Sequence, residues 1–200
     1  ALKVDVASAA DLGPLAEYLK KSSSGRILSF PHSLSLLEER FKTWPDFRLE
    51  SFLVAKDKRG QIVGAVAPWN NGAVSGLIPT AFSGFVQTAQ SALKIGSWLG
   101  WTNSMTLEKP LEIEFLTHLY ANNADVFRLL IEEAYRRKAP GSFLVYPHFH
   151  NHPLTLAPKH FITSSTPATL HTVDVTGADA FGDVPDSPLH RPPEFELCLA

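Results

Sequence analysis

The sequence is poor in several features that mark particular classes of protein. It has one cysteine, Cys198, so no intrachain disulfide can form, and this is typical of a reducing compartment; we expect a cytoplasmic location. The formal net charge of −2 offers no basic surface, so we expect no nucleic-acid partner. No basic stretch followed by an apolar run is visible at the start, so we expect no secretion signal. The chain begins at Ala1 rather than methionine, which leaves open whether it is processed or part of a longer protein.

Charge is also scarce between Gln61 and Leu107, where Lys94 is the only charged residue. Apolar residues in this stretch keep helical spacing, but asparagines, glutamines, glycines and prolines interrupt it, so we expect no transmembrane segment. The spaced positions are Phe82, Phe85, Val86, Ala89 and Leu93. We predict an uncharged helical insertion at about 72–107 that covers the sheet. The alternatives are a wall of a substrate pocket and a surface for a partner or a membrane.

The clearest pattern in the chain is strand, helix, strand between Leu111 and Tyr146. Residues 111–120 favour a strand, and residues 142–146 are a short apolar run after a Pro-Gly stop. The helix between them, at 123–138, carries its apolar side chains on one stripe and the pairs Glu132–Arg136 and Glu133–Arg137 on its outer side. A connection of this length predicts two parallel strands with a right-handed crossover. The helix start then presents backbone N–H groups that favour an anion.

The remaining pattern predicts a single domain, because the 200 residues with 44% apolar content can bury one core. Spacing predicts a strand at 2–6, helices at about 12–21 and 34–44, and a hairpin of 52–56 with 61–67. Ser8 and Asp11 resemble a capped helix start. Residues 168–175 and 195–199 are further strand candidates, separated by a Pro-rich loop at about 177–193.

This order of elements resembles the GNAT superfamily of acyl-CoA-dependent N-acyltransferases over nearly the whole chain. The segments that carry it are LKVDVASAADLGPLAEYL, FLVAKDKRGQIVGAVAPW, EIEFLTHLYANNADVFRLLIEEAYRRK, SFLVY, ATLHTVDV and FELCLA. The resemblance implies an α/β fold whose sheet is mixed and mostly antiparallel, with one parallel β-α-β unit and helices on both faces. It also implies acetyl-CoA or another acyl-CoA as cofactor, bound between the fourth and fifth strands.

The resemblance places the cofactor's pyrophosphate at the start of the helix at 123–138. The residues implied in cofactor binding are Leu116, Leu119, Tyr120, Asn122, Asn123, Ala124 and Arg128. The family's loop normally reads Gln/Arg-x-x-Gly-x-Gly/Ala, whereas this chain has Ala-Asn-Asn-Ala-Asp at 121–125. Glycine lets backbone amides approach a phosphate closely, and Asp125 repels its charge. We therefore expect CoA to be held mainly through its pantetheine arm, by strand backbone.

Acylation of an amine needs a group that removes a proton from the attacking ammonium. On a strand of period two, one face would carry Glu112, Glu114, Leu116, His118 and Tyr120. Many GNAT proteins have a glutamate on this strand, so the resemblance implies Glu114 as the base and His118 as the second candidate. The alternative is a strand face that is only solvated or hydrogen-bonded. The family often uses a tyrosine after the fifth strand to protonate the departing thiolate; Tyr146, another group, or none fills that role here.

Two other features predict no chemistry. His148, His150 and His152 alternate in a polar segment without a nearby carboxylate or cysteine, so we expect no metal site. Cys198 lies in an apolar run without an adjacent base, which predicts packing rather than nucleophilic attack.

The function that this sequence favours is transfer of an acetyl or other acyl group from a CoA thioester to an amine, carried by a small molecule or a peptide. The alternative is a catalytically inactive GNAT-like domain that binds a ligand or a partner. A third reading is a structural domain that binds a partner through residues 61–107. Whether the chain forms a homodimer or joins a second domain in a longer protein stays open.

Overall fold

The computed structural model describes residues 2–24, 32–70, 72, 78, 110–148, 156–161, 163 and 165. Several predictions lie outside these residues: the helical insertion at about 72–107, apart from positions 72 and 78, the strands at 168–175 and 195–199, and the Pro-rich loop at about 177–193. His150, His152 and Cys198 also lie outside them.

The described elements follow the predicted order along the chain. They are β1 (Lys3–Val6), η1 (Ala9–Asp11), α1 (Leu12–Ser23), α2 (Leu34–Thr43), η2 (Leu49–Ser51), β2 (Leu53–Lys56), β3 (Ile62–Asn70), β4 (Ile113–Ala121), α4 (Ala124–Arg137) and β5 (Phe143–Val145). Helix α2 begins after Ser33, whose hydroxyl accepts from the Leu36 N–H, and ends before Pro45. Helix α4 begins after Asn123, whose side chain accepts from the Val126 N–H at 3.0 Å.

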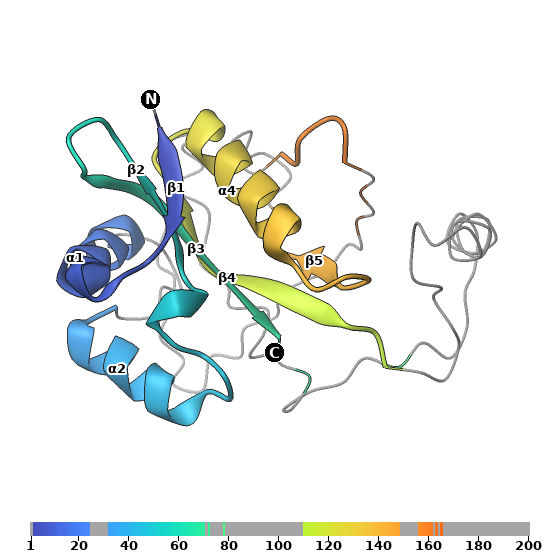
Figure 1. The fold of residues 1–200 in the computed structure, drawn as a ribbon, viewed down its shortest axis with the longest axis horizontal. Coiled ribbons are helices and arrows are strands. Elements are labelled where there is room, and N and C mark those ends of the chain that lie inside the picture. The colour runs from blue at the N-terminus through green and yellow to red at the C-terminus, as the bar shows by residue number, and fades with distance from the viewer. Residues whose placement is uncertain are drawn as a thin grey trace, which may run out of the picture.

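The described strands form one sheet in the order β1-β2-β3-β4-β5. The first three pairs are antiparallel, and β4 and β5 are parallel because α4 connects them as a crossover. Helices α1 and α2 lie on one side of this sheet and α4 on the other (Figure 1). The predicted fold class is therefore confirmed: α/β, with a mixed and mostly antiparallel sheet, one parallel β-α-β unit, and helices on both faces.

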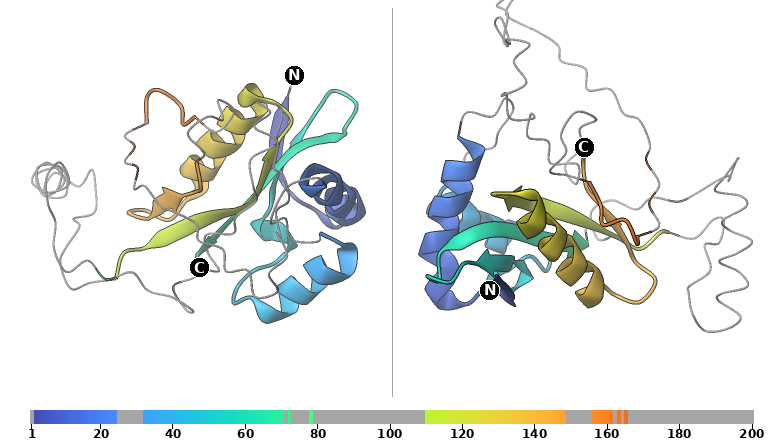
Figure 2. Two further views of the ribbon diagram at one scale, coloured as in Figure 1. Left: turned by 180° about the vertical axis from the view of Figure 1, so that it is seen from behind. Right: turned by 90° about the horizontal axis from the view of Figure 1, so that it is seen from above.

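The two faces of the sheet bury separate hydrophobic cores. Figure 2 shows the helices that cover these faces from two further sides. One core joins α1 and α2 to the sheet and contains Leu15, Leu19, Leu37, Phe47, Phe52, Val54, Ala65, Ala67, Trp69 and Tyr120. The other joins α4 to the sheet and contains Leu53, Ala55, Val66, Leu116, Val126, Phe127, Leu130, Ile131 and Ala134. The predicted apolar stripe of α4 thus faces the sheet, as its spacing requires.

Helix α4 approaches the sheet closely at Gly64 in β3. A Cβ atom at this position would lie 2.4 Å from Cγ1 of Val126 and 3.3 Å from the carbonyl oxygen of Tyr120. A side chain here would push α4 away from the sheet, so glycine is needed for this distance between the layers.

The outer face of α4 carries an ion-pair group centred on Glu133. Its carboxylate accepts from Arg136 at 2.6 Å and from Arg137 at 2.5 Å. The predicted Glu133–Arg137 pair is confirmed. The predicted Glu132–Arg136 pair is wrong, because Arg136 pairs with Glu133, three residues before it, instead of with Glu132. Glu132 instead lies 4.0 Å from Nε2 of His160.

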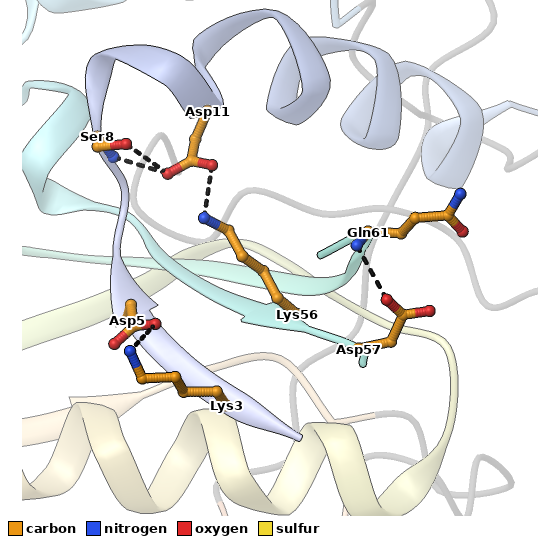
Figure 3. A network of polar contacts seen from close by, with 7 residues as sticks. All are labelled: Lys3, Asp5, Ser8, Asp11, Lys56, Asp57 and Gln61. Carbon is orange, nitrogen blue, oxygen red and sulfur yellow. Dashed lines mark hydrogen bonds and ion pairs between the residues drawn. The ribbon is translucent and has the colours of Figure 1, made fainter. Parts of the chain in front are cut away.

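A polar network ties the start of α1 to β2 (Figure 3). The Asp11 carboxylate accepts from the Ser8 N–H at 2.9 Å and the Ser8 hydroxyl at 2.8 Å. Its other oxygen lies 2.6 Å from Nζ of Lys56, and the hydrogen bond from this ammonium holds the pKa of Asp11 below its usual value. The capped start predicted from Ser8 and Asp11 is therefore present, and it also anchors the β1–α1 connection to the sheet.

Candidate functional site

The pairing of β5 with β4 ends partway along β4. The paired residues are Ile113 with Phe143, Glu114 with Leu144, and Phe115 with Val145, whereas β4 continues to Ala121. Helix α4 begins at Ala124, directly beyond the end of β4. We call the edge of β4 at residues 116–121, beyond the last pair with β5 and before the start of α4, the β4–β5 gap.

A β-bulge interrupts β4 inside this gap. Ala65 and Ala67 of β3 pair with Tyr120 and Thr117, so three steps along β4 match two along β3. His118 lies within the bulge and has φ of +50°, a left-handed conformation that is uncommon for a residue other than glycine. The bulge therefore reverses which face of the sheet the following side chains occupy.

The prediction that Glu112, Glu114, Leu116, His118 and Tyr120 share one face is wrong. Leu116 packs in the α4 core, and Leu119 packs against the same core, whereas Tyr120 belongs to the α1/α2 core. The physical reason is the extra residue at the bulge, which strict alternation does not allow for. His118 consequently lies on the side of α1 and α2, with its ring centroid 5.6 Å from that of Phe47 and 5.2 Å from that of Phe52.

His118 belongs to a polar group, which we call the histidine cluster: His32, Arg40, Thr117, His118 and Tyr120, all buried except the half-buried Arg40. The exposed fractions of His118 and Tyr120 are only 2% and 3%. Nε2 of His32 lies 2.9 Å from the Tyr120 hydroxyl, and the two imidazole rings are 5.3 Å apart between centroids. His118 itself contacts the Arg40 guanidinium through Nε2 and the Thr117 hydroxyl through Nδ1.

These contacts determine the protonation state of His118. Arginine can only donate, so Nε2 of His118 must accept from Arg40, and the proton of the neutral ring lies on Nδ1, facing Thr117. Burial, followed by the charge of Arg40 and the ring of His32, holds the pKa of His118 well below its usual value. The ring is therefore neutral at neutral pH, and its single lone pair is already used by Arg40.

Glu114 has a different environment from the one that strand alternation suggested. Its Oε1 accepts both from the Ala139 N–H at 2.8 Å and from the Ser142 hydroxyl at 2.7 Å, in the turn between α4 and β5. Among the described residues, no hydrogen bond to Oε2 is found. One oxygen of Glu114 is thus held by the turn, and the other retains its capacity to accept a proton.

Tyr146 follows β5 directly and lies level with Leu116 if the β4–β5 register is continued. Its ring packs edge-on against Phe127, with centroids 5.7 Å apart, and burial raises the pKa of its phenol. The hydroxyl therefore keeps its proton at neutral pH. Tyr146 and Leu144 pack against the α4 core, the same core that contains Leu116, two residues after Glu114 on β4.

The start of α4 uses the predicted cofactor residues for its own structure. Asn123 caps the helix, and the Asn122 side chain accepts from the Tyr18 hydroxyl at 3.1 Å. The Asn122 N–H donates to the Val63 carbonyl at 3.0 Å. Arg128 pairs with Asp125 at 3.5 Å on the surface, so its charge is partly engaged beside the helix start.

Sequence reasoning missed His32, Arg40 and Ser142. His32 and Tyr120 are 88 residues apart, and Arg40 and His118 are 78 apart, so no local spacing links them. Ser142 was visible only as the start of a strand candidate. Within the described part of the chain, no three histidine, cysteine or acidic side chains converge on a metal position, and no helix is long and apolar enough to cross a membrane.

Comparisons with known proteins do not assign this chain to a family. No protein-family model matches this sequence, and no curated protein is significantly similar to it. A solved structure that matches is the crystal structure of mosquito arylalkylamine N-acetyltransferase like 5b, with 10% identity over 68% of this chain and 70% of that chain. Its TM-score is 0.34, and a superposition at that level carries no argument about this protein.

Proposed function

We propose that this protein transfers an acetyl or other acyl group from a CoA thioester to an amine, with the thioester bound in the β4–β5 gap. The observation that supports the proposal best is that pairing with β5 ends at Phe115, while β4 continues to Ala121, just before the start of α4. The edge of a strand beyond its last pair leaves backbone groups for an extended ligand, and a helix start beyond it favours an anion. Acyl-CoA has both features, an amide-bearing arm and a pyrophosphate.

The residues of the gap fit the arm of the cofactor better than its phosphates. Leu116, Leu119 and Tyr120 would act through their backbone, since their side chains pack in the two cores. At the helix start, Asn122, Asn123 and Ala124 offer amides, but Asp125 brings a negative charge and pairs with Arg128. We therefore expect weak, salt-sensitive binding in which Arg128 meets the phosphates only by leaving Asp125.

For the base, we place Glu114 ahead of His118. The only lone pair of the His118 ring accepts from Arg40, whereas Glu114 Oε2 has capacity to take a proton from the amine. Ser142 and the Ala139 N–H would orient that carboxylate by holding Oε1. A positioned base of this kind contributes roughly 10²–10⁴ in rate.

Tyr146 is the proposed proton donor to the departing sulfur. It keeps its proton at neutral pH and lies at the end of β5, beside the gap. Bound acyl-CoA would supply the activated acyl group, whose carbonyl carbon exchanges its bond to sulfur for one to the amine nitrogen. Glu114 Oε2 would take one proton from the ammonium and release it to solvent, and would then take a second from the nitrogen as the C–S bond breaks and the Tyr146 hydroxyl gives a proton to the sulfur. Return of the second proton from Glu114 to Tyr146 through solvent restores both groups.

A catalytically inactive domain that binds a ligand or a partner is the second candidate. It is favoured by the Asp125–Arg128 pair and by the absence of glycine at 121–125, both of which weaken phosphate binding at the helix start. On this reading Glu114 and Ser142 only stabilise the turn between α4 and β5.

Calorimetric titration with CoA, acetyl-CoA and longer acyl-CoAs, followed by thiol release with a panel of amines, separates the two candidates. Titrations at low and high salt should show weaker binding at high salt if phosphates contribute. The variant Cys198→Ser removes the single thiol of the protein from the assay background. Binding together with amine-dependent thiol release supports the acyltransferase. No binding at millimolar CoA would leave the inactive domain as the better account.

A further inference from the structure

The proposed chemistry gives no first role to the side chains of the histidine cluster, although the cluster buries two imidazoles and a phenol beside the bulge in β4. It joins two parts of the chain that the sheet does not connect. His32 and Arg40 come from the segment that contains α2, and Thr117, His118 and Tyr120 come from β4. Its contacts therefore hold α2 against the sheet.

The position of Arg40 makes this contact depend on the charge of His118. A neutral imidazole has one lone pair, and here it accepts from the Arg40 guanidinium. A protonated imidazole has donors at both nitrogens, so its Nε2–H would face an N–H of Arg40 with no acceptor between them. The imidazolium and the guanidinium would also repel each other as two positive charges. Proton uptake therefore breaks the Arg40 contact and weakens the attachment of α2 to β4.

Several other groups lie near His118. Besides Arg40 from α2, the His32 ring, before α2, lies 5.3 Å from the His118 ring between centroids, and the Tyr120 hydroxyl, on β4, lies 2.9 Å from Nε2 of His32. The rings of Trp44, Phe47 and Phe52 also contact His118 and carry no charge. From α1, Ala16 and Leu19 line a narrow crevice beside His32 and Arg40 and are apolar.

We propose that the histidine cluster is an acid-sensitive latch: proton uptake by His118 releases α2 from β4 while the rest of the sheet stays folded. The element that moves is α2 with Trp44 at its end. The Trp44 ring stacks on the ring of Trp69 in β3, with centroids 4.5 Å apart. The Arg40 guanidinium lies 5.2 Å from the centroid of the Trp44 ring. Because the cluster adjoins the bulge, release of α2 would also change the backbone that borders the β4–β5 gap.

Hydrogen exchange of the whole chain, corrected for intrinsic rates, tests the latch. Between about pH 7.5 and pH 5, the equilibrium constant for opening of α2 should increase about 30-fold. This factor is the one expected for a single histidine that has an ordinary pKa of about 6.5 in the open state and must be neutral in the closed state. Opening of α4, which packs on the other face, should change by less than about 3-fold. The near-ultraviolet circular dichroism of the Trp44–Trp69 stack should fall over the same pH range.

Two variants remove the latch by different routes. Asparagine tolerates the left-handed backbone and does not titrate, so His118→Asn should reduce the acid response of α2 to less than about 3-fold. Arg40→Met keeps the stem but removes the charge, so its response should be smaller than that of the wild type, with burial of His118 accounting for what remains. His160→Asn, at an exposed histidine beside α4, is the matched control and should respond like the wild type.

Two results overturn the proposal. One is an acid response of α2 that Arg40→Met and His118→Asn both retain in full. The other is an α4 that opens by the same factor as α2, which would mean unfolding of the whole domain. If His118→Asn does not fold, Arg40→Met and the α2-to-α4 ratio of the wild type still decide the outcome.

Discussion

The Ser142 hydroxyl donates to Oε1 of Glu114 at 2.7 Å, across a separation of 28 residues. The Ala139 N–H donates to the same oxygen, so the turn between α4 and β5 fixes one side of the carboxylate. Both a structural role and a catalytic role need the carboxylate in this place. They differ in what the second oxygen does.

Substituting Glu114 by glutamine separates these roles. The amide oxygen of Glu114→Gln can still accept from Ser142 and Ala139, but the side chain no longer takes a proton. If the protein acylates amines, turnover should fall by about 10²-fold or more, while acyl-CoA affinity and the free energy of unfolding change little. Glu112→Gln, at an exposed glutamate just before β4, is the control and should keep full turnover. Unchanged turnover in Glu114→Gln would move the base role to His118 or to water.

Two substitutions at the start of α4 should change CoA affinity in opposite directions. Asp125→Gly removes a negative charge and frees both Arg128 and the backbone, so binding should become tighter by about 3- to 10-fold. Arg128→Ala should weaken binding by a similar factor. Added salt should then reduce CoA affinity less in this variant than in the wild type. Glu132→Gln changes the net charge by the same amount as Asp125→Gly farther along α4, and calorimetry should show little effect. A response of equal size in Glu132→Gln would mean that net charge, not the helix start, controls binding.

The contact between Gly64 and Val126 predicts a strong coupling of stability. Gly64→Ala alone should destabilise the protein by about 2–3 kcal/mol, because its Cβ would lie 2.4 Å from Cγ1 of Val126. Val126→Ala alone should cost about 1–3 kcal/mol, but the double variant should lose less than the sum, since the smaller side chain makes room. Denaturant unfolding of all four proteins measures the coupling. Additive losses would show that α4 does not approach Gly64 this closely.

The Glu133 group predicts a defined pH dependence. Hydrogen bonds from Arg136 and then Arg137 lower the pKa of Glu133 to about 2. A carboxyl with a lowered pKa in the folded state stabilises the fold above its ordinary pKa, and this contribution is lost as the pH falls from about 4.5 toward 2. Glu133→Gln should remove that part of the acid loss, by roughly 1 kcal/mol or less for a surface pair. Glu132→Gln serves as the control, and equal pH profiles for both variants would contradict the assignment.

Local patterns in the sequence predicted the main helices and strands of the described residues and much of their arrangement. The apolar stripe of α4, the turn at Asp57–Gly60 and the crossover between two strands each act over a few residues, so spacing alone predicted the helix, the hairpin and the parallel pair. The same patterns predicted the mixed sheet with helices on both faces.

The tertiary structure decided which side chains meet. The bulge at His118 follows from the register of β4 on β3, and it reversed the faces that strict alternation predicted for the end of the strand. The partners of Glu114, His118 and Tyr120 come from distant segments, so packing of the layers, not local spacing, brings them together. A sequence pattern records the preferences of neighbouring residues, whereas register and packing depend on the whole folded chain, and the candidate site is built from the latter.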